Sequence, residues 1–206
     1  MNKIILIGGA PTIGKSFIAR KISEQFKIPW VSTDTIREMM RKIVREEDFP
    51  KLFRAMGFGI DAEEYLSTRT PQQIVEGQNA ESIDVWKGVE AIIDTDYVWE
   101  DLIIEGVHVL PEFVGKINKS VHKIKPIFLV DENEERVRNV VYTRGLADDA
   151  DTYPDSVKEV EVQWVDLFNK YILDEVEKYG FKCYEIGDRN SFIKSLSQEL
   201  KEWLLS

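Results

Sequence analysis

Hydrophobic and polar positions along the chain alternate between short apolar runs and longer amphipathic segments. Residues 3–8 form an almost continuous apolar run, the pattern of a strand that is buried on both faces of a parallel sheet. Ile18, Ile22 and Phe26 then recur every four residues and predict one apolar stripe of a helix. Further apolar runs predict strands at residues 30–32, 102–104, 124–130 and 183–186. Because helical segments separate these strands, we expect an α/β fold with a five-stranded parallel sheet and helices on both faces.

The helical segments predict how the chain is organised around that sheet. A helix is expected at residues 35–45, with Thr33 or Asp34 as its N-cap, and Pro71 is expected to begin a long helix. Residues 46–100 then form a helical insert between the second and third strands, at the sheet edge where open α/β sheets bind ligands. Charged helices are expected at residues 132–144, 156–178 and 191–205. We therefore expect a single domain over residues 1–206, with an acceptor-site insert at 46–100 and a short lid at 132–152.

Composition narrows the classes of partner. The formal net charge of -10 argues against a nucleic-acid partner, because neutralising phosphates takes clustered Lys and Arg. Cys183 is the only cysteine, so no intramolecular disulfide forms and a reducing compartment fits best. No stretch approaches the ~18 apolar residues of a membrane helix. We expect a cytoplasmic protein without a membrane partner, and the composition leaves the oligomeric state open.

A phosphate-binding motif follows the first strand and matches the pattern G-x-x-x-x-G-K-[ST] in full. It consists of Gly9, Ala10, Pro11, Thr12, Ile13, Gly14, Lys15 and Ser16. Glycines let backbone N–H groups point inward around a phosphate, and the following helix adds partial positive charge at its N-terminus. Lys15 is expected to reach the β- and γ-phosphates of ATP, and the Ser16 hydroxyl to ligate Mg²⁺. The motif predicts the P-loop NTPase fold, ATP and Mg²⁺ as cofactors, and a catalytic role for Lys15.

Two carboxylates lie at the ends of neighbouring strands. Asp34 follows the second strand and Glu105 ends the third, so both should face the phosphate loop. A carboxylate there serves either to hold Mg²⁺ or to take the proton of an acceptor hydroxyl. We assign Asp34 to the acceptor and Glu105 to the metal shell and the acceptor side, although the reverse assignment is also open. The alternatives are a plain helix cap for Asp34 and a surface carboxylate for Glu105.

Three neighbours of these carboxylates are further candidates for the acceptor site. Arg37 lies one helical turn after Asp34, and its guanidinium suits a phosphate or carboxylate. Gly106 follows Glu105 and would leave room for a ligand. His108 lies in a loop beside the expected anion site and is assigned to the acceptor. The alternatives are a surface arginine and a loop histidine bonded to backbone.

An arginine-rich helix follows the fourth strand. It carries Arg136, Arg138 and Arg144, and arginines in a lid stabilise the charge that develops during phosphoryl transfer. We assign Arg144 to catalysis and Arg136 to the nucleotide, and the acidic loop 148–151 to the moving part of the lid. The alternative is a solvated helix with Glu–Arg pairs one turn apart. Gly187, after the fifth strand, is expected to border the adenine.

Several of these motifs together resemble a known family. The matching segments are residues 6–10 running into 14–16, residues 32–37 and residues 104–111, the last with the run Glu-Gly-Val-His. They resemble the 2-phosphoglycerate kinase family, within the adenylate kinase and shikimate kinase superfamily of P-loop kinases. The resemblance spans roughly residues 1–145. It implies transfer of the γ-phosphoryl group of ATP to 2-phosphoglycerate, which gives 2,3-bisphosphoglycerate.

Two other functions remain open from the sequence. A nucleoside or nucleotide kinase would use the same fold and loop, with the helical insert holding the acceptor. A non-catalytic ATP-binding sensor would bind nucleotide without transfer. A GTPase switch is disfavoured, because Asn118-Lys119-Ser120 is followed by Val121 and not by the aspartate of the guanine-binding motif.

Overall fold

The central element of the protein is a parallel β-sheet with strand order β2-β3-β1-β4-β5. The computed structural model describes residues 2–53, 61–95, 97–118, 121–145 and 150–206. The strands are β1 (Lys3–Gly9), β2 (Trp30–Ser32), β3 (Asp101–Glu105), β4 (Lys123–Val130) and β5 (Cys183–Glu185). All paired strands run parallel, which confirms the predicted five-stranded parallel sheet.

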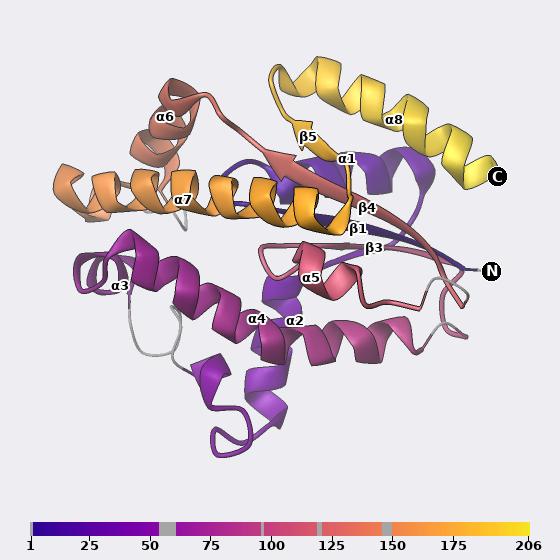
Figure 1. Ribbon diagram of the computed structural model, residues 1–206, viewed down its shortest axis with the longest axis horizontal. Helices are drawn as coiled ribbons and strands as arrows, with labels where there is room; N and C mark the ends of the chain where they lie inside the picture. Colours follow the sequence, from indigo (N-terminus) through magenta and orange to yellow (C-terminus); the bar gives the residue numbers. More distant parts are fainter. Residues whose placement is uncertain (1, 54–60, 96, 119–120, 146–149) are drawn as a thin grey trace.

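Helices cover both faces of this sheet (Figure 1). One face carries α1 (Lys15–Phe26) and α8 (Arg189–Leu205), which pack against each other. The other face carries α5 (Pro111–Val114) and α7 (Asp155–Tyr179), and α4 (Pro71–Ile93) packs on the outer side of α7. α2 (Thr33–Ile43), α3 (Ala62–Ser67), α6 (Glu134–Arg144) and the 3₁₀ turns at Pro50–Phe53 and Ala150–Thr152 complete the described chain.

The segment expected to be a helical insert contains helices joined by turns in its described part. It contains one 3₁₀ turn, α3 and α4, while residues 54–60 and 96 lie outside the described chain. α4 begins at Pro71, as predicted, because Thr70 and Gln73 form a reciprocal capping box and proline suits the first helical position. No helix in the described ranges is both long and apolar enough to cross a bilayer.

The start of α2 differs from the prediction. The helix begins at Thr33, and its cap is Ser32, whose hydroxyl accepts a hydrogen bond from the Thr35 backbone nitrogen at 3.0 Å. Thr33 or Asp34 as N-cap is therefore wrong. Ser32 takes this role because strand β2 runs directly into the helix, without an intervening loop. As a result, the carboxylate of Asp34 is not used to close the helix end.

Register within the sheet brings the functional segments to one edge. Ile7 of β1 lies beside Glu105 of β3, and Ser32 of β2 lies beside the same glutamate. On the other side of β1, Gly9 lies beside Leu129 of β4. Because parallel strands end at the same edge, the phosphate loop, the start of α2 and the end of β3 converge there.

The turn after β3 depends on a close approach between Gly106 and Thr33. Gly106 has a φ of +148°, and a Cβ atom placed on it would lie 1.8 Å from Thr33 Oγ1. The expectation that this glycine leaves room for a ligand is wrong, because the fully buried Thr33 side chain fills that space. Gly106 instead lets the first residue of α2 pack against the end of β3.

We predict that Gly106→Ala lowers the free energy of unfolding by ~2 kcal/mol or more, because the methyl group would clash with Thr33 and the backbone would be strained. Gly77→Ala is the matched control, since Gly77 lies in the exposed face of α4 with no atom within 4 Å of the added methyl. That change should raise stability by ~0.5–1 kcal/mol. Denaturant unfolding measures both. Equal effects of the two substitutions would contradict the packing argument.

Candidate functional site

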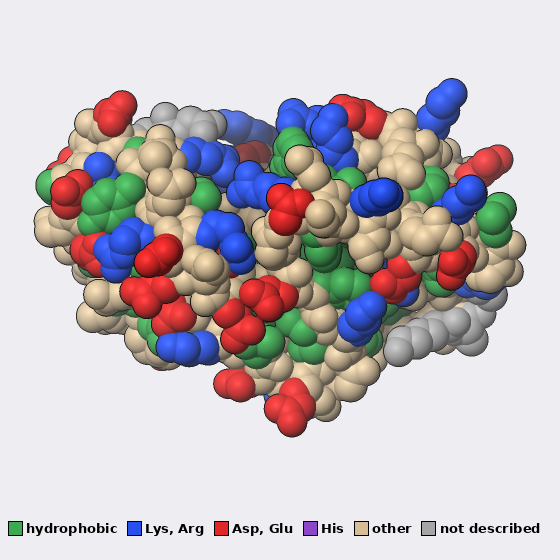
Figure 2. All heavy atoms as spheres, turned by 90° about the horizontal axis from the view of Figure 1, so that it is seen from above, with side chains coloured by type: hydrophobic (Ala, Val, Ile, Leu, Met, Phe, Trp, Pro, Cys, Tyr) green, Lys and Arg blue, Asp and Glu red, His purple; other side chains and the backbone are tan. Residues whose placement is uncertain are grey.

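A cavity of about 700 Å³ opens where these segments converge at the carboxyl edge of the sheet. Its lining comes from the phosphate loop, from α1, α2, α3, α4, α6 and α7, from the end of β3 and from Arg189 at the start of α8. Although the chain is acidic overall, Lys and Arg side chains are interspersed with acidic ones over the face shown in Figure 2. The cavity itself is lined by Lys15, Arg37 and Arg144, among other cations, so an anion meets local positive charge there in spite of the net charge.

The phosphate loop has the geometry that anion binding requires. Gly9 and Gly14 adopt φ values of +144° and +96°, and a Cβ on Gly9 would lie 2.4 Å from the Leu129 carbonyl oxygen. α1 begins at Lys15, and no side chain caps its N-terminus. The first N–H groups of α1 are therefore available to a phosphate, with the helix dipole behind them.

Lys15 is a buried cation at the start of α1. Its side chain lies in the cavity wall, and the residue is only 7% exposed. Nζ donates a hydrogen bond to the Ala10 carbonyl oxygen at 2.6 Å. Burial lowers the pKa of Lys15 to about 8, while Glu105 and Asp34 oppose that shift. A phosphate beside the ammonium would favour its charged form again.

Ser16, in the phosphate loop, and Glu105, at the end of β3, lie together close to Lys15. Glu105 is 1% exposed, so it is not a surface carboxylate. Burial raises the pKa of Glu105, and the positive charge of Lys15 and a hydrogen bond from the Ser16 hydroxyl counteract that rise. Glu105 Oε1 has no hydrogen-bond partner in the described part of the chain. A hydroxyl and an unpaired carboxylate oxygen are hard ligands that fit Mg²⁺.

The described residues contain no cluster of three or more His, Cys, Asp and Glu suited to a metal ion. This is compatible with Mg²⁺ at a phosphate site, since Mg²⁺ there takes one or two protein ligands and completes its shell with phosphate oxygens and water.

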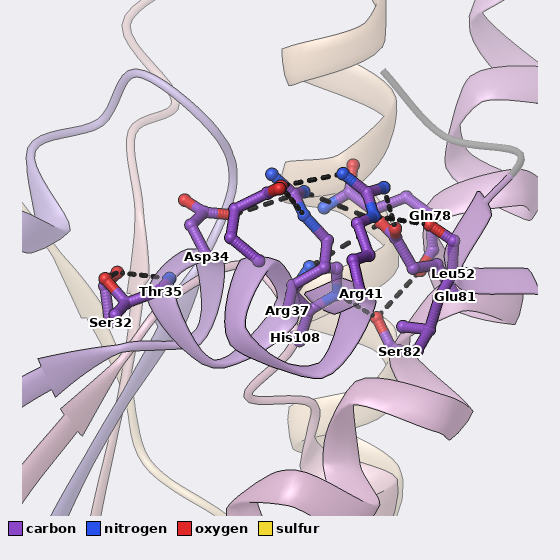
Figure 3. Close-up of polar contacts among 11 residues, drawn as sticks. Ser32, Asp34, Thr35, Arg37, Arg41, Leu52, Gln78, Glu81, Ser82 and His108 are labelled. Carbon is purple, nitrogen blue, oxygen red and sulfur yellow. Dashed lines mark hydrogen bonds and ion pairs between the residues drawn. The ribbon is translucent and has the colours of Figure 1, made fainter. Parts of the chain in front are cut away.

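Asp34 and Arg37 face the cavity from α2 (Figure 3). Arg37 Nη1 lies 3.3 Å from Asp34 Oδ1 and 3.7 Å from Glu81 Oε2. The Arg37 side chain is 15% exposed and that of Asp34 is 59% exposed. Arg37 is therefore a cation in the cavity wall and not a surface arginine, and Asp34 remains open to the cavity.

His108 differs from a loop histidine bonded to backbone. It is fully buried, lines the cavity, and its Nδ1 lies 2.8 Å from the Ser82 hydroxyl oxygen. Because the Ser82 hydroxyl donates to the Gln78 carbonyl oxygen at 2.8 Å, Nδ1 is the protonated nitrogen and donates to Ser82. Burial lowers the pKa of His108 to about 3, so the ring is neutral and Nε2 carries a lone pair.

Glu81 was not identified from the sequence. It lies on α4, is 2% exposed, and accepts a hydrogen bond from Arg41 Nη2 at 2.9 Å. Burial raises the pKa of Glu81 to about 7, and Arg37 and Arg41 limit that rise. The sequence did contain a signal. Gln78 and Glu81 occupy positions within the apolar stripe of α4 that Ile74 and Val85 continue.

The lid arginines separate into two groups. Arg144 lines the cavity. Burial is the main cause of the low pKa of Lys15, and the positive charge of Arg144 lowers it further. Arg136 is absent from the cavity lining and binds Asp131 through two hydrogen bonds of 2.6 and 2.7 Å. Arg138 pairs with Glu159. Residues 146–149, which include part of the predicted acidic loop, lie outside the described chain.

The segment after β5 contributes a different residue from the one predicted. Gly187 does not line the cavity, whereas Arg189 does, and the Arg189 guanidinium lies 3.6 Å from the position of a Cβ on Gly14. Other wall residues that the sequence did not reveal are Tyr65, Gln78 and Trp164. All three come from helices α3, α4 and α7, whose placement depends on tertiary packing.

We predict that buried His108 makes stability fall in acid. Its pKa in the fold, about 3, lies below the ordinary value of 6.5, so the unfolded chain binds the extra proton. The stabilisation is therefore complete above pH 6.5 and is lost as pH falls toward 3, by about 2 kcal/mol at pH 5. His108→Asn keeps a donor to Ser82 and should remove this component. Chemical unfolding of both proteins at pH 7 and pH 5 tests it, and parallel pH profiles would contradict it.

Comparison with known proteins identifies relatives of the chain. It is 31% identical over 185 residues to the 2-phosphoglycerate kinase of Methanocaldococcus jannaschii, which covers 88% of this chain and 58% of that protein. It is 30% identical over 219 residues to the 2-phosphoglycerate kinase of Methanothermobacter thermautotrophicus, which covers 95% of this chain and 65% of that protein. The chain thus spans 58% and 65% of the length of these two curated relatives. No family model matches the chain.

Solved structures share the fold at low sequence identity. Shikimate kinase from Acinetobacter baumannii has a TM-score of 0.50 at 11% identity, over 100% of this chain and 93% of that one. Deoxyadenosine kinase from M. mycoides has a TM-score of 0.50 at 13% identity, over 97% of this chain and 99% of that one. The chain therefore has the fold of the P-loop kinases, and its sequence relatives are 2-phosphoglycerate kinases.

Proposed function

We propose that this protein is an ATP-dependent small-molecule kinase that transfers the γ-phosphoryl group to 2-phosphoglycerate. The observation that carries the proposal is a single cavity lined both by the phosphate loop and by an acceptor side made of Asp34, Arg37, Glu81 and His108. The relatives named 2-phosphoglycerate kinase support the choice of acceptor. An enzyme that draws on ATP also fits the cytoplasmic location expected from the sequence.

On the nucleotide side, each residue has a role that follows from its position. The amides of the phosphate loop hold the phosphates, and Lys15 moves from the Ala10 carbonyl oxygen to the β- and γ-phosphates. Ser16 and Glu105 would hold Mg²⁺, which would supply positive charge beside the transferring group. Arg144 stabilises that charge from the lid side.

On the acceptor side, Asp34 orients the attacking hydroxyl and takes its proton, because its carboxylate is open to the cavity and not used as a helix cap. Arg37 binds an anionic group of the acceptor. α3 and α4, from the helical insert, supply the wall that closes around this end of the acceptor. In-line transfer then requires that ATP and the acceptor occupy the two ends of the cavity at the same time.

We predict that ADP formation in ATP and Mg²⁺ rises with 2-phosphoglycerate and not with 3-phosphoglycerate, glycerate, shikimate or nucleoside monophosphates. A coupled ADP assay measures each acceptor. Stimulation by a nucleoside monophosphate would show that the acceptor is a nucleotide and would favour a nucleotide kinase. Tight ATP binding without stimulation by any acceptor would favour the non-catalytic sensor.

We predict that Lys15→Ala lowers kcat by ~100-fold or more, because the buried ammonium belongs to the phosphate loop itself and lies against the Ala10 carbonyl oxygen. The matched control is Lys21→Ala, which changes an exposed lysine of the same helix that pairs with Glu24 and does not line the cavity. That variant should keep wild-type kcat. Thermal unfolding establishes that both variants fold, and wild-type turnover by Lys15→Ala would refute the mechanism.

A further inference from the structure

One face of α4 forms a wall of the acceptor side of the cavity. Gln78 and Glu81 lie three residues apart on that face, and both line the cavity. Ser82, next to Glu81, turns toward His108 (Figure 3). The roles proposed above use Asp34 and Arg37 on the acceptor side but leave Gln78 without one.

The amide of Gln78 is buried without a hydrogen-bond partner. The residue is 5% exposed, and neither Oε1 nor Nε2 makes a hydrogen bond to any described residue. A buried amide in this state carries a free-energy penalty unless something binds it. Since Gln78 lines the cavity, a molecule that enters the cavity is the natural partner.

The neighbours of Gln78 are already held by other bonds. The Gln78 backbone carbonyl accepts from Ser82, and the Ser82 oxygen accepts from His108. Glu81 is held by Arg41, whose Nε also donates to the Leu52 carbonyl oxygen at 2.6 Å. The wall is therefore preorganised. Its open hydrogen-bonding groups among the described residues include His108 Nε2, which can only accept in this tautomer, and the Gln78 amide, which offers N–H donors.

Charge around the amide favours an anion. Arg37 lies beside Glu81, which is one helical turn from Gln78 on α4. Arg37 Nε donates to Glu38 Oε1 at 3.1 Å, and Nη1 lies 3.7 Å from Glu81 and 3.3 Å from Asp34. These distances are longer than the charge-assisted hydrogen bonds of 2.7–2.9 Å that guanidinium groups form with carboxylates. An anionic oxygen of an acceptor can therefore gain from both the Arg37 charge and the Gln78 N–H.

Resting on the proposed kinase function, we propose that Gln78 is a specificity-determining residue whose amide nitrogen donates to a carboxylate or phosphate oxygen of the acceptor. Arg37 balances the charge of that group, and Glu81 acts as a positioning residue that holds Arg37 at the cavity wall. The ligand class is a small oxyanion that also carries the hydroxyl to be phosphorylated. The amide oxygen of Gln78 can accept from a further hydroxyl of the same molecule.

The test compares steady-state kinetics of Gln78→Leu, Gln78→Glu and the control Gln72→Leu, which removes an exposed amide of the same helix. We expect Gln78→Leu to raise KM for 2-phosphoglycerate by roughly 10- to 100-fold, with little change in KM for ATP. Gln78→Glu should raise it further, because it places a carboxylate against the anion. Gln78→Asn, which keeps a shorter amide, should recover part of the loss.

Inhibition constants identify which anionic group the amide binds. Glycerate and inorganic phosphate are used as competitors of 2-phosphoglycerate. If Gln78→Leu raises the inhibition constant of glycerate, the amide binds the carboxylate. If it raises that of inorganic phosphate, the amide binds the phosphate group. Unchanged KM and inhibition constants in an active Gln78→Leu variant would overturn this inference and leave the kinase function standing. A wild-type protein that neither binds nor phosphorylates 2-phosphoglycerate would overturn the proposed function first, and this inference with it.

Discussion

The position of β1 between β3 and β4 is the constraint on which the whole site depends. Parallel pairing on both sides of β1 places its last residue beside Leu129 and its Ile7 beside Glu105. A shift of one residue in the pairing of β1 with β3 would move Glu105 away from Ser16 and turn it to the other face of the sheet. The contact of Gly106 with Thr33 extends the same constraint to α2, and so to Asp34 and Arg37.

Buried charge is arranged in two separate sets around the cavity. At the phosphate loop, Lys15 is balanced by Glu105, and both are desolvated. At the acceptor side, Glu81 is balanced by Arg37 and Arg41. Buried charges are stable only when paired, so each set holds its members in place. An anion bound at either end would place its negative charge beside Lys15 or Arg37.

The fold and part of the site could be predicted from local sequence patterns. The rest of the site depends on contacts between segments that are distant in the sequence. The parallel sheet was predicted correctly because strands buried on both faces are recognisable as apolar runs. The cap of α2 was not, since Ser32 and Asp34 are chemically equivalent candidates and only the strand–helix junction selects between them. Arg136 and Arg144 lie on the same helix, and only the position of Asp131 shows which one is held outside the cavity.

By itself, the sequence determined the phosphate loop, because its eight residues are contiguous and their glycine, lysine and hydroxyl spacing is a local requirement of phosphate binding. It also determined the class of fold, through the alternation of apolar runs with amphipathic helices. Only the tertiary structure decided the acceptor wall. Gln78 and Glu81 lie far from the loop in sequence, and packing of α4 against α2 and α7 is what buries them and brings them to the cavity.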